Sequence, residues 1–281
     1  MRIDGHGHAC GEYLSLSSIK SQLDTYGFDC VVLCPGQLNN PKSYPLPELA
    51  KFLPSVNLIK YSNLLTKGVV KFFQVENDLS VGNQYVWELA SQSRGRVIQF
   101  FWLTRKMVST QLTNKSENLV FSYLDRQYEN YGFAGIKLHQ CWEKFTVESE
   151  YFKSVAKWAI SKKLPLFIHL GSRKEVLKLL QLKSQLPELK LIIAHLFGFD
   201  LAIKKGLPSG TFFDISTYQL VSDRKLLRAV KELGPEKLIF GTDTPYGKNN
   251  LGGNLNRLSR LGLDHKSKKL ILGKNMEELL F

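Results

Sequence analysis

Residues 133–195 contain three short apolar runs that each end in histidine, and these runs decide the fold. They read F-A-G-I-K-L-H at 133–139, L-P-L-F-I-H at 164–169 and L-K-L-I-I-A-H at 189–195. The terminal histidines are 169 − 139 = 30 and 195 − 169 = 26 positions apart. A (β/α)8 barrel of roughly 250 residues averages about 31 residues per repeat. The spacing therefore predicts consecutive βα repeats with a histidine at the end of each strand.

Five further short apolar runs bring the number of expected strands to eight. They are R-I-D-G-H at 2–6, F-D-C-V-V-L at 28–33, R-V-I-Q-F-F-W-L at 96–103, T-F-F-D-I-S at 211–216 and K-L-I-F-G-T-D at 237–243. Amphipathic stretches with apolar residues at three- and four-residue steps separate most of them. These expected helices cover Ser17–Tyr26, Asn118–Tyr131, Glu148–Ser161, Arg173–Gln185 and Ser222–Leu233. The pattern predicts the α/β class, as one (β/α)8 TIM-type barrel in a single domain over residues 1–281.

The segment from about Gly36 to Ser93 is the irregular part of this pattern. A single crossover does not need so many residues, so we expect an elaborated segment between strands 2 and 3. Two structures fit Asn39–Lys71 equally well. One is a loop over the active-site face, and the other is an extra helix packed on the side of the barrel.

The charge of the chain is strongly positive, with 38 Lys and Arg against 25 Asp and Glu and a formal net charge of +13. Because the basic residues are spread along the chain, solvated helix faces are the first interpretation, steering of an anionic substrate the second and a nucleic-acid footprint the third. Met1 is followed by no leader pattern, and no apolar run is long enough to cross a bilayer. We expect a cytoplasmic protein without membrane contact, and a homo-oligomer remains open.

The triplet His6-Gly7-His8 carries the strongest chemical signal. Alternation along a strand places both imidazoles on one face, where they converge in a metal-binding geometry. His169 ends one apolar run and Asp243 another. Polar residues at the C-terminal ends of barrel strands tend to be catalytic, and three imidazoles with one carboxylate form a normal zinc set. The sequence therefore predicts a metal site of His6, His8, His169 and Asp243.

His195 is a fifth candidate, because its run lies between those that end in His169 and Asp243. It is either another ligand or an acid/base beside the metal that polarises the substrate. We favour the acid/base role. A histidine merely hydrogen-bonded in the barrel mouth ranks third.

The motifs together resemble the amidohydrolase superfamily. They include I-D-G-H-G-H, G-I-K-L-H, L-F-I-H-L-G, L-I-I-A-H-L-F-G, L-I-F-G-T-D-T-P-Y-G and the closing L-I-L-G-K-N-M-E-E-L-L-F. Their order and the final motif are most similar to the amidohydrolase-2 (amidohydrolase-related) group, nearly end to end. The resemblance implies a (β/α)8 barrel, metal binding by His6, His8, His169 and Asp243, and assistance from His195. It also implies one metal ion, with Zn²⁺ first and another divalent transition metal as the alternative.

Lys137 and His139 lie two positions apart in G-I-K-L-H, so they share a face of the expected fourth strand. In binuclear relatives a carbamylated lysine or a glutamate on that strand bridges two metals. We rank both residues as contacts to an anionic substrate first and as ligands of a second metal next, and a buried lysine paired with an acidic neighbour is the third reading. Arg173 follows the fifth strand closely and is the third expected substrate contact.

These residues predict a metal-dependent hydrolase in which a metal-bound water attacks a C–N or C–O bond of a small, carboxylate-bearing substrate. Asp243 is suited to accept the proton of that water, and His195 to stabilise charge on the carbonyl oxygen. A non-oxidative decarboxylase using the same site is the nearest alternative.

Two other classes of protein compete with this prediction. The +13 charge and T-D-T-P-Y keep a TatD-like metal-dependent deoxyribonuclease open. However, such enzymes carry a metal-ligating glutamate on the fourth strand, where this chain reads G-I-K-L-H, so nucleic acid ranks below a small molecule as partner. A non-enzymatic barrel is disfavoured by the almost complete ligand set.

Overall fold

The computed structural model of the chain describes all residues except 39–41, 43–45, 74–78, 111–116 and 248. Eight parallel strands form one sheet in the order of the sequence. They are β1 (Ile3–His8), β2 (Cys30–Cys34), β3 (Val97–Trp102), β4 (Gly135–His139), β5 (Leu166–His169), β6 (Leu191–Ile193), β7 (Thr211–Asp214) and β8 (Leu238–Ile239).

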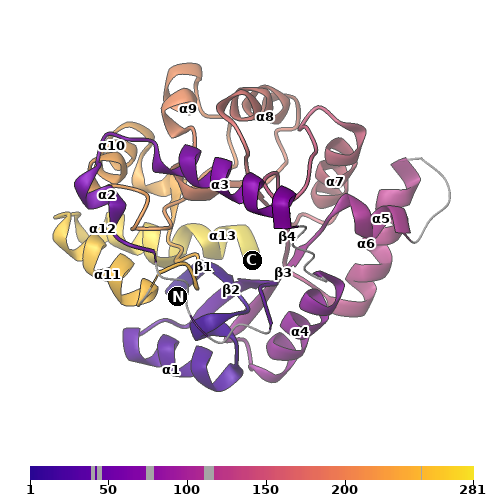
Figure 1. The fold of residues 1–281 in the computed structure, drawn as a ribbon, viewed down its shortest axis with the longest axis horizontal. Helices are drawn as coiled ribbons and strands as arrows, with labels where there is room; N and C mark the ends of the chain where they lie inside the picture. The colour runs from indigo at the N-terminus through magenta and orange to yellow at the C-terminus, as the bar shows by residue number, and fades with distance from the viewer. Residues whose placement is uncertain (39–41, 43–45, 74–78, 111–116, 248) are drawn as a thin grey trace.

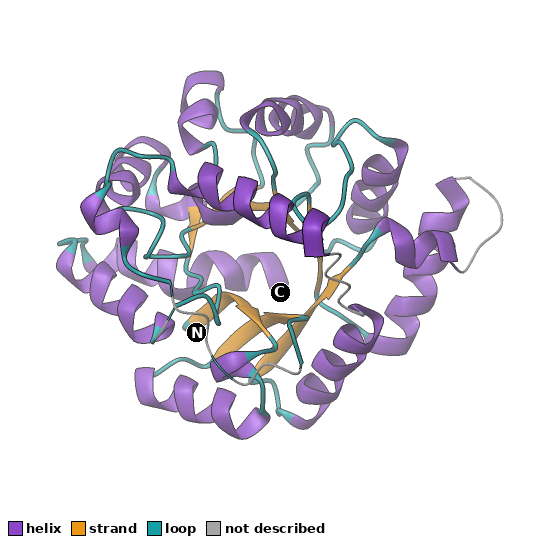
Figure 2. Ribbon diagram, viewed as in Figure 1, coloured by secondary structure: helices purple, strands orange, loops and turns teal. Residues whose placement is uncertain are grey.

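Hydrogen bonds between β1 and the chain around β8 close this sheet into a barrel. The amide of Gly5 donates to the carbonyl of Phe240 over 2.9 Å, and the amide of His8 donates to the carbonyl of Thr244 over 2.9 Å. Figure 2 shows the strands inside a ring of helices. The predicted (β/α)8 TIM-type barrel is confirmed.

Helices follow most strands, and most of them pack on the outside of the barrel (Figure 1). The helices are α1 (Leu16–Tyr26), α2 (Leu49–Phe52), α3 (Leu58–Phe73), α4 (Leu79–Gln92), α5 (Arg105–Thr110), α6 (Glu117–Tyr131), α7 (Glu150–Ser161), α8 (Arg173–Gln185), α9 (Phe199–Lys205), α10 (Asp223–Leu233), α11 (Asn250–Arg260), α12 (His265–Lys269) and α13 (Asn275–Leu280). Several begin at a serine whose hydroxyl accepts an amide of the first turn, as N-caps do. These serines are Ser15, Ser149, Ser172 and Ser222.

Apolar side chains divide between the two faces of the sheet. Val31 and Leu33 point outwards into the core between strands and helices, whereas Cys30, Val32 and Cys34 point into the barrel. The inner core also contains residues of α13, which lies across the end of the barrel opposite α3. Alternation along a strand produces this division, because successive side chains point to opposite faces.

The elaborated segment between β2 and β3 contains the helix α3, which crosses the mouth of the barrel in Figure 1. The two structures expected for Asn39–Lys71 are therefore combined, since an extra helix is present but covers the active-site face. Part of that stretch, 39–41 and 43–45, lies outside the described residues. Leu58 and Ile59 anchor α3 in the core, and Asn63 donates to the carbonyl of Leu170 over 2.9 Å.

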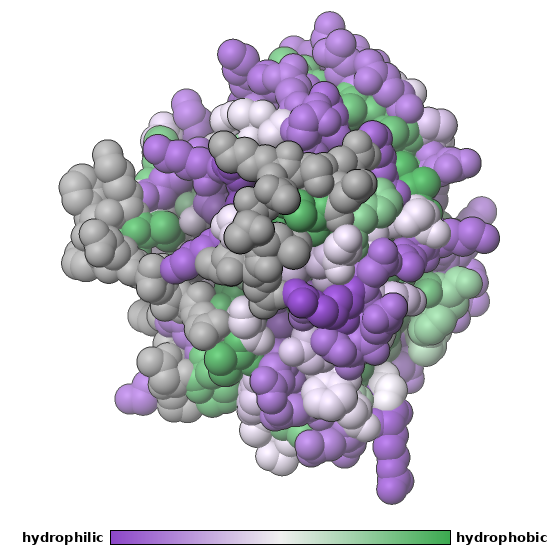
Figure 3. All heavy atoms as spheres, turned by 90° about the vertical axis from the view of Figure 1, so that its right-hand side faces the viewer, coloured by the Kyte–Doolittle hydropathy of each residue, from purple (hydrophilic) through white to green (hydrophobic). Residues whose placement is uncertain are grey.

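The outer surface of the helices is mixed in character. On the side of the molecule turned to the viewer in Figure 3, hydrophilic residues are interspersed with hydrophobic areas. No helix within the described part of the chain is both long enough and apolar enough to span a bilayer.

Candidate active site

Five predicted site residues converge at the C-terminal mouth of the barrel, beneath α3. His6 and His8 come from β1, His169 ends β5, His195 follows β6 and Asp243 follows β8. The ligand atoms of His6, His195 and Asp243 lie within 4.8 Å of one another. These side chains line a pocket of about 180 Å³.

Asp243 is the centre of this group. Its Oδ1 lies 3.4 Å from Nε2 of His6 and 3.4 Å from Nε2 of His8, and its Oδ2 lies 3.8 Å from Nε2 of His195. Burial alone would raise the pKa of Asp243, but the surrounding imidazoles outweigh burial and lower it to about 2. The carboxylate is therefore ionised at neutral pH.

Two of the four imidazoles have their outer nitrogen fixed by an oxygen of the barrel rim. His6 directs Nδ1 to Oδ2 of Asp214 at 3.1 Å, and His8 directs Nδ1 to the carbonyl of Pro35 at 2.8 Å. A carboxylate and a carbonyl can only accept, so both Nδ1 atoms carry the proton. In their neutral forms, both residues therefore present the lone pair of Nε2 to the pocket.

The other two imidazoles, those of His169 and His195, also carry the proton on the outer nitrogen, and their inner nitrogens face each other. His169 directs Nε2 to Oδ1 of Asn63 at 2.7 Å, and His195 directs Nδ1 to the carbonyl of Ser216 at 3.0 Å. Asn63 gives its amide hydrogen to Leu170, which identifies Oδ1 as the acceptor. The neutral forms of His169 and His195 therefore bring two lone pairs together, Nδ1 to Nε2, at 3.1 Å. A proton or a cation has to lie between them.

This arrangement fits a divalent transition metal. Burial, followed by Lys137, holds the pKa of His6 well below 6.5, and burial, followed by His139, does the same for His169. Neutral imidazoles and an ionised carboxylate are the donors that zinc binds. Two nitrogens at 2.0–2.1 Å from one tetrahedral ion are about 3.3 Å apart. The facing nitrogens of His169 and His195 are 3.1 Å apart, close to that value, and Oδ1 of Asp243 lies at a similar 3.4 Å from Nε2 of His6 and of His8.

Lys137 and His139 both line the pocket from β4, as their shared face predicted. Nζ of Lys137 donates to Nε2 of His6 over 2.9 Å and lies 3.8 Å from the centre of the Phe167 ring. An imidazole nitrogen has one lone pair, so Lys137 and a metal ion compete for His6. Burial lowers the pKa of Lys137.

His139 differs from the other imidazoles because its proton lies on the nitrogen that faces the pocket. Its Nδ1 accepts the amide of Cys141 over 3.1 Å, so its Nε2 carries the proton in the neutral form. The ring stacks on His169 with centroids 3.9 Å apart and on Trp102 at 5.6 Å. His139 therefore offers a hydrogen-bond donor, whereas a metal ligand would need a free lone pair.

Arg173 is the one predicted site residue that lies outside this pocket. It begins α8 and forms two hydrogen bonds to Asp200, of 2.8 and 2.6 Å. Both residues line a neighbouring cleft that shares His195 with the central pocket. An expected contact of Arg173 with the substrate is therefore possible only through that cleft.

Two side chains that the sequence did not single out, Asp214 and Ser216, hold two of the imidazoles. Asp214 is fully buried at the end of β7 and accepts the amide of His195 over 3.2 Å. The hydroxyl of Ser216 lies 3.2 Å from Nδ1 of His6 and 3.0 Å from Nδ1 of His195. Gly241 is required beside them, because a Cβ there would collide with Asp214 and His6. The signal was available, since Asp214 ends a strand at the same edge as the ligands.

An eight-stranded parallel barrel with metal-type side chains at its C-terminal mouth has the architecture of a TIM-barrel enzyme. The model of the family described as TatD related DNase matches residues 58–278, and the chain belongs to this family. No curated protein sequence matches the chain.

Several solved structures share the fold of this chain. A probable 2-pyrone-4,6-dicarboxylic acid hydrolase from Acinetobacter baumannii, solved with citric acid bound, is 14% identical with a TM-score of 0.66, over 99% of this chain and 98% of that one. A 4-oxalomesaconate hydratase from Rhodopseudomonas palustris is 14% identical with a TM-score of 0.62, over 100% and 95%.

A third such structure contains a metal ion. It is a 5-carboxyvanillate decarboxylase from Novosphingobium aromaticivorans, solved with manganese and 4-hydroxy-3-methoxy-5-nitrobenzoic acid. It is 11% identical with a TM-score of 0.64, over 100% of this chain and 96% of that one. The expected barrel enzyme is therefore confirmed, and the family that matches is the TatD-related one, which the sequence kept as an alternative.

Proposed function

We propose that this protein is a metal-dependent hydrolase that cleaves a C–N or C–O bond of a small, carboxylate-bearing substrate. One observation carries the proposal. Four imidazoles have their outer nitrogens fixed by Asp214, Pro35, Asn63 and Ser216, so their inner lone pairs converge beside an ionised carboxylate. Outer hydrogen bonds of this kind orient histidines in metal sites.

His6, His8, His169 and Asp243 would hold one divalent transition metal, with Zn²⁺ ranked first and Mn²⁺ as the alternative. A bound ion of this kind lowers the pKa of water and polarises a carbonyl oxygen. Asp243 is ionised at the centre of the group and is suited to take the proton of the attacking water.

His195 is proposed as the acid/base beside the metal. Its Nδ1–H is committed to the carbonyl of Ser216, so its neutral form can only accept a proton at Nε2. The protonated form would donate from Nε2 to charge that develops on the substrate's oxygen. The compact group formed by His6, His195 and Asp243 also fits a ligand role for His195, and metal analysis of a His195 variant separates the two roles.

Lys137 and His139 are proposed to bind the substrate's carboxylate. Each offers a hydrogen-bond donor to the pocket, and an ammonium paired with an imidazole retains its charge for an anion. The aromatic walls Trp102, Trp142 and Tyr246 suit a flat or apolar body attached to that carboxylate. The relatives solved with citric acid and with a nitrobenzoic acid bind carboxylic acids, which supports this class of substrate.

Two other reactions remain candidates. The decarboxylase among the structural relatives keeps loss of CO₂ at the same site open. The TatD-related family and the net charge of +13 favour a deoxyribonuclease. Against the nuclease, β4 supplies Lys137 where a second ion needs a carboxylate, and residues Ile59, Ser62 and Thr66 of α3 line the small central pocket.

A side-by-side assay of the metal-loaded enzyme tests this ranking. The panel contains carboxylate-bearing lactones and amides, carboxylated phenols and single-stranded DNA. We expect turnover of a lactone or amide that is lost in Asp243→Asn, and no DNA cleavage. CO₂ release without hydrolysis would place the decarboxylase first. DNA cleavage that is lost in Asp243→Asn, with no activity on the panel, would place the nuclease first.

A further inference from the structure

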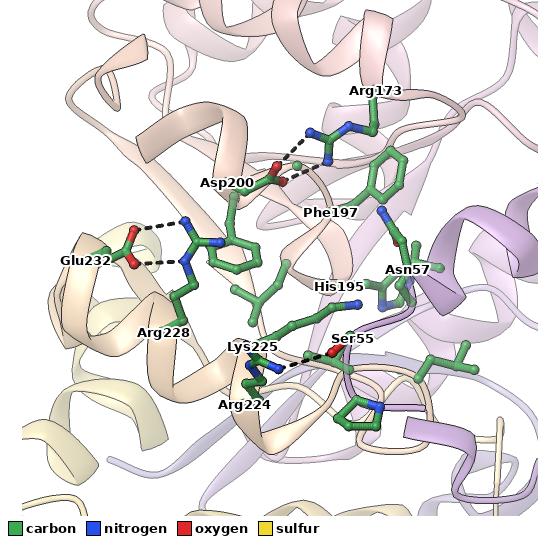
Figure 4. Close-up of a pocket in the computed structure, with 17 residues that line it drawn as sticks. Ser55, Asn57, Arg173, His195, Phe197, Asp200, Arg224, Lys225, Arg228 and Glu232 are labelled. Atoms are coloured by element: carbon green, nitrogen blue, oxygen red, sulfur yellow. Dashed lines mark hydrogen bonds and ion pairs between the residues drawn. The ribbon is translucent and has the colours of Figure 1, made fainter. Parts of the chain in front are cut away.

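A second cleft of about 600 Å³ opens beside the central pocket. It lies between α9, α10 and the chain that precedes α3, and Figure 4 shows its lining side chains. Ile59, His195 and Leu220 line both cavities. A ligand in the central pocket could therefore extend past His195 into this cleft.

Four cationic and two acidic side chains line the cleft. Two of the cations are neutralised by carboxylates. Arg173 forms its two hydrogen bonds with Asp200, and Arg228 forms two with Glu232, of 2.8 and 3.3 Å. Figure 4 shows both ion pairs among the residues that line the cleft.

The other two cations contact neutral oxygens. The guanidinium of Arg224 donates to the hydroxyl of Ser55 over 3.2 Å, and the ammonium of Lys225 donates to the carbonyl of Val56 over 2.5 Å. Across the residues that the structure describes, no carboxylate forms an ion pair with either of them. Lys225 is partly buried, and burial lowers its pKa, although Asp200 opposes that effect. Its positive charge is therefore incompletely compensated.

We propose that Arg224 and Lys225 bind the phosphate group of a phosphomonoester whose reactive end lies in the central pocket. A phosphomonoester carries a charge of about −1.5 to −2 at pH 7, which matches the two uncompensated cations. The apolar side chains of Phe197, Leu220 and Val221, which line the cleft, would contact the carbon chain that joins the two ends. This inference rests on the proposed function, because it adds a second anionic group to the substrate of that site.

Binding of inorganic phosphate to the full chain, measured by calorimetry, tests the proposal without requiring turnover. The metal-loaded wild type should bind phosphate, and both Arg224→Gln and Lys225→Met should weaken binding at least about 10-fold. Arg224→Lys should stay within about threefold of the wild type. Lys231→Gln is the matched control, because it removes a charge from an exposed position of α10 outside the cleft.

Three outcomes would overturn the proposal. They are no phosphate binding by the wild type, equal binding by the wild type and Arg224→Gln, and binding of succinate but not of phosphate. Arg224 is exposed, so its variant remains informative if Lys225→Met, which loses the contact to Val56, does not fold. Absence of hydrolysis on the whole panel would refute the proposed function and leave a measured phosphate site intact.

Discussion

Replacing Asp214 by asparagine tests how the barrel rim prepares the metal site. Oδ2 of Asp214 accepts from Nδ1 of His6, the hydroxyl of Ser216 and the amide of His195, and Oδ1 accepts the amide of Ser216. Asparagine offers one oxygen and one NH₂ group, so at least one donor would face another donor. The charge that fixes the proton on Nδ1 of His6 would also be lost.

The expected effect follows from the role of such outer contacts. Removing one costs about 10- to 100-fold in metal affinity, which is about 1.4–2.7 kcal/mol. We therefore expect Asp214→Asn to bind Zn²⁺ about 10- to 100-fold more weakly than the wild type, in competition with a chromophoric chelator. Ser216→Ala keeps the carboxylate and should lose less.

Asp24→Asn is the matched control, because Asp24 is 65% exposed and pairs with Arg96 far from the site. It should bind Zn²⁺ like the wild type. Circular dichroism at the assay temperature shows whether each variant is folded. A folded Asp214→Asn with unchanged Zn²⁺ affinity would refute the argument that this carboxylate sets the tautomer of His6.

Three further predictions concern single residues. His195→Asn should retain most of the metal and lose roughly 100-fold in turnover, which is the range of a lost acid/base contact. His169→Asn, in contrast, should lose the metal. If His195→Asn loses metal in step with activity, His195 is a ligand. Lys137→Met should bind metal more tightly, because the lone pair of His6 is freed. The same variant should raise KM for a carboxylate substrate about 10-fold or more. An unchanged KM would show that Lys137 does not bind the substrate. Burial raises the pKa of Glu143 to about 7, so the folded state favours the protonated carboxyl. The contribution of this carboxyl to the stability of the fold is complete below about pH 4.5 and is lost as the pH rises to about 7. Glu143→Gln should therefore raise the melting temperature relative to the wild type at pH 8 but not at pH 4. The corresponding gain in the free energy of unfolding at pH 8 has an upper bound of about 3 kcal/mol. An equal shift of the melting temperature at both pH values would contradict this.

The fold could be predicted because each strand is an unbroken apolar run that ends at a polar residue. A strand buried on both faces needs such a run, and the 30- and 26-residue spacings leave room for one helix per repeat. The position of α3 could not be predicted in the same way. Its sequence forms an amphipathic helix anywhere on the barrel, and only contacts such as that of Asn63 with His169 place it over the mouth.

The residue types of the site could be predicted from the sequence, but the nitrogen that carries the proton in each histidine could not. His139 and His169 both end apolar runs and look alike in the sequence, yet one accepts an amide hydrogen at Nδ1 and the other faces a partner's lone pair with the same atom. This difference depends on the turn after each strand. His195 and Asp243 also lie beyond the regular strands, with φ of 61° and 55°, so strand alternation does not determine their direction.

The roles of Asp214 and Arg173 depend on partners distant in the chain. Asp214 meets His6 across 208 positions, and Arg173 meets Asp200 across 27. Neither pairing leaves a local pattern. The sequence therefore predicts a substrate contact for Arg173, and only the fold shows that Arg173 pairs with Asp200 of the neighbouring helix.

The metal content of the purified protein, measured by elemental analysis after reconstitution with Zn²⁺ or Mn²⁺, tests the central claim most directly. The converging lone pairs predict close to one equivalent of a divalent transition metal in the wild type, and loss of that metal when His6→Ala is combined with His8→Ala. No bound metal after reconstitution, or full metal content in the folded double variant, would contradict the account.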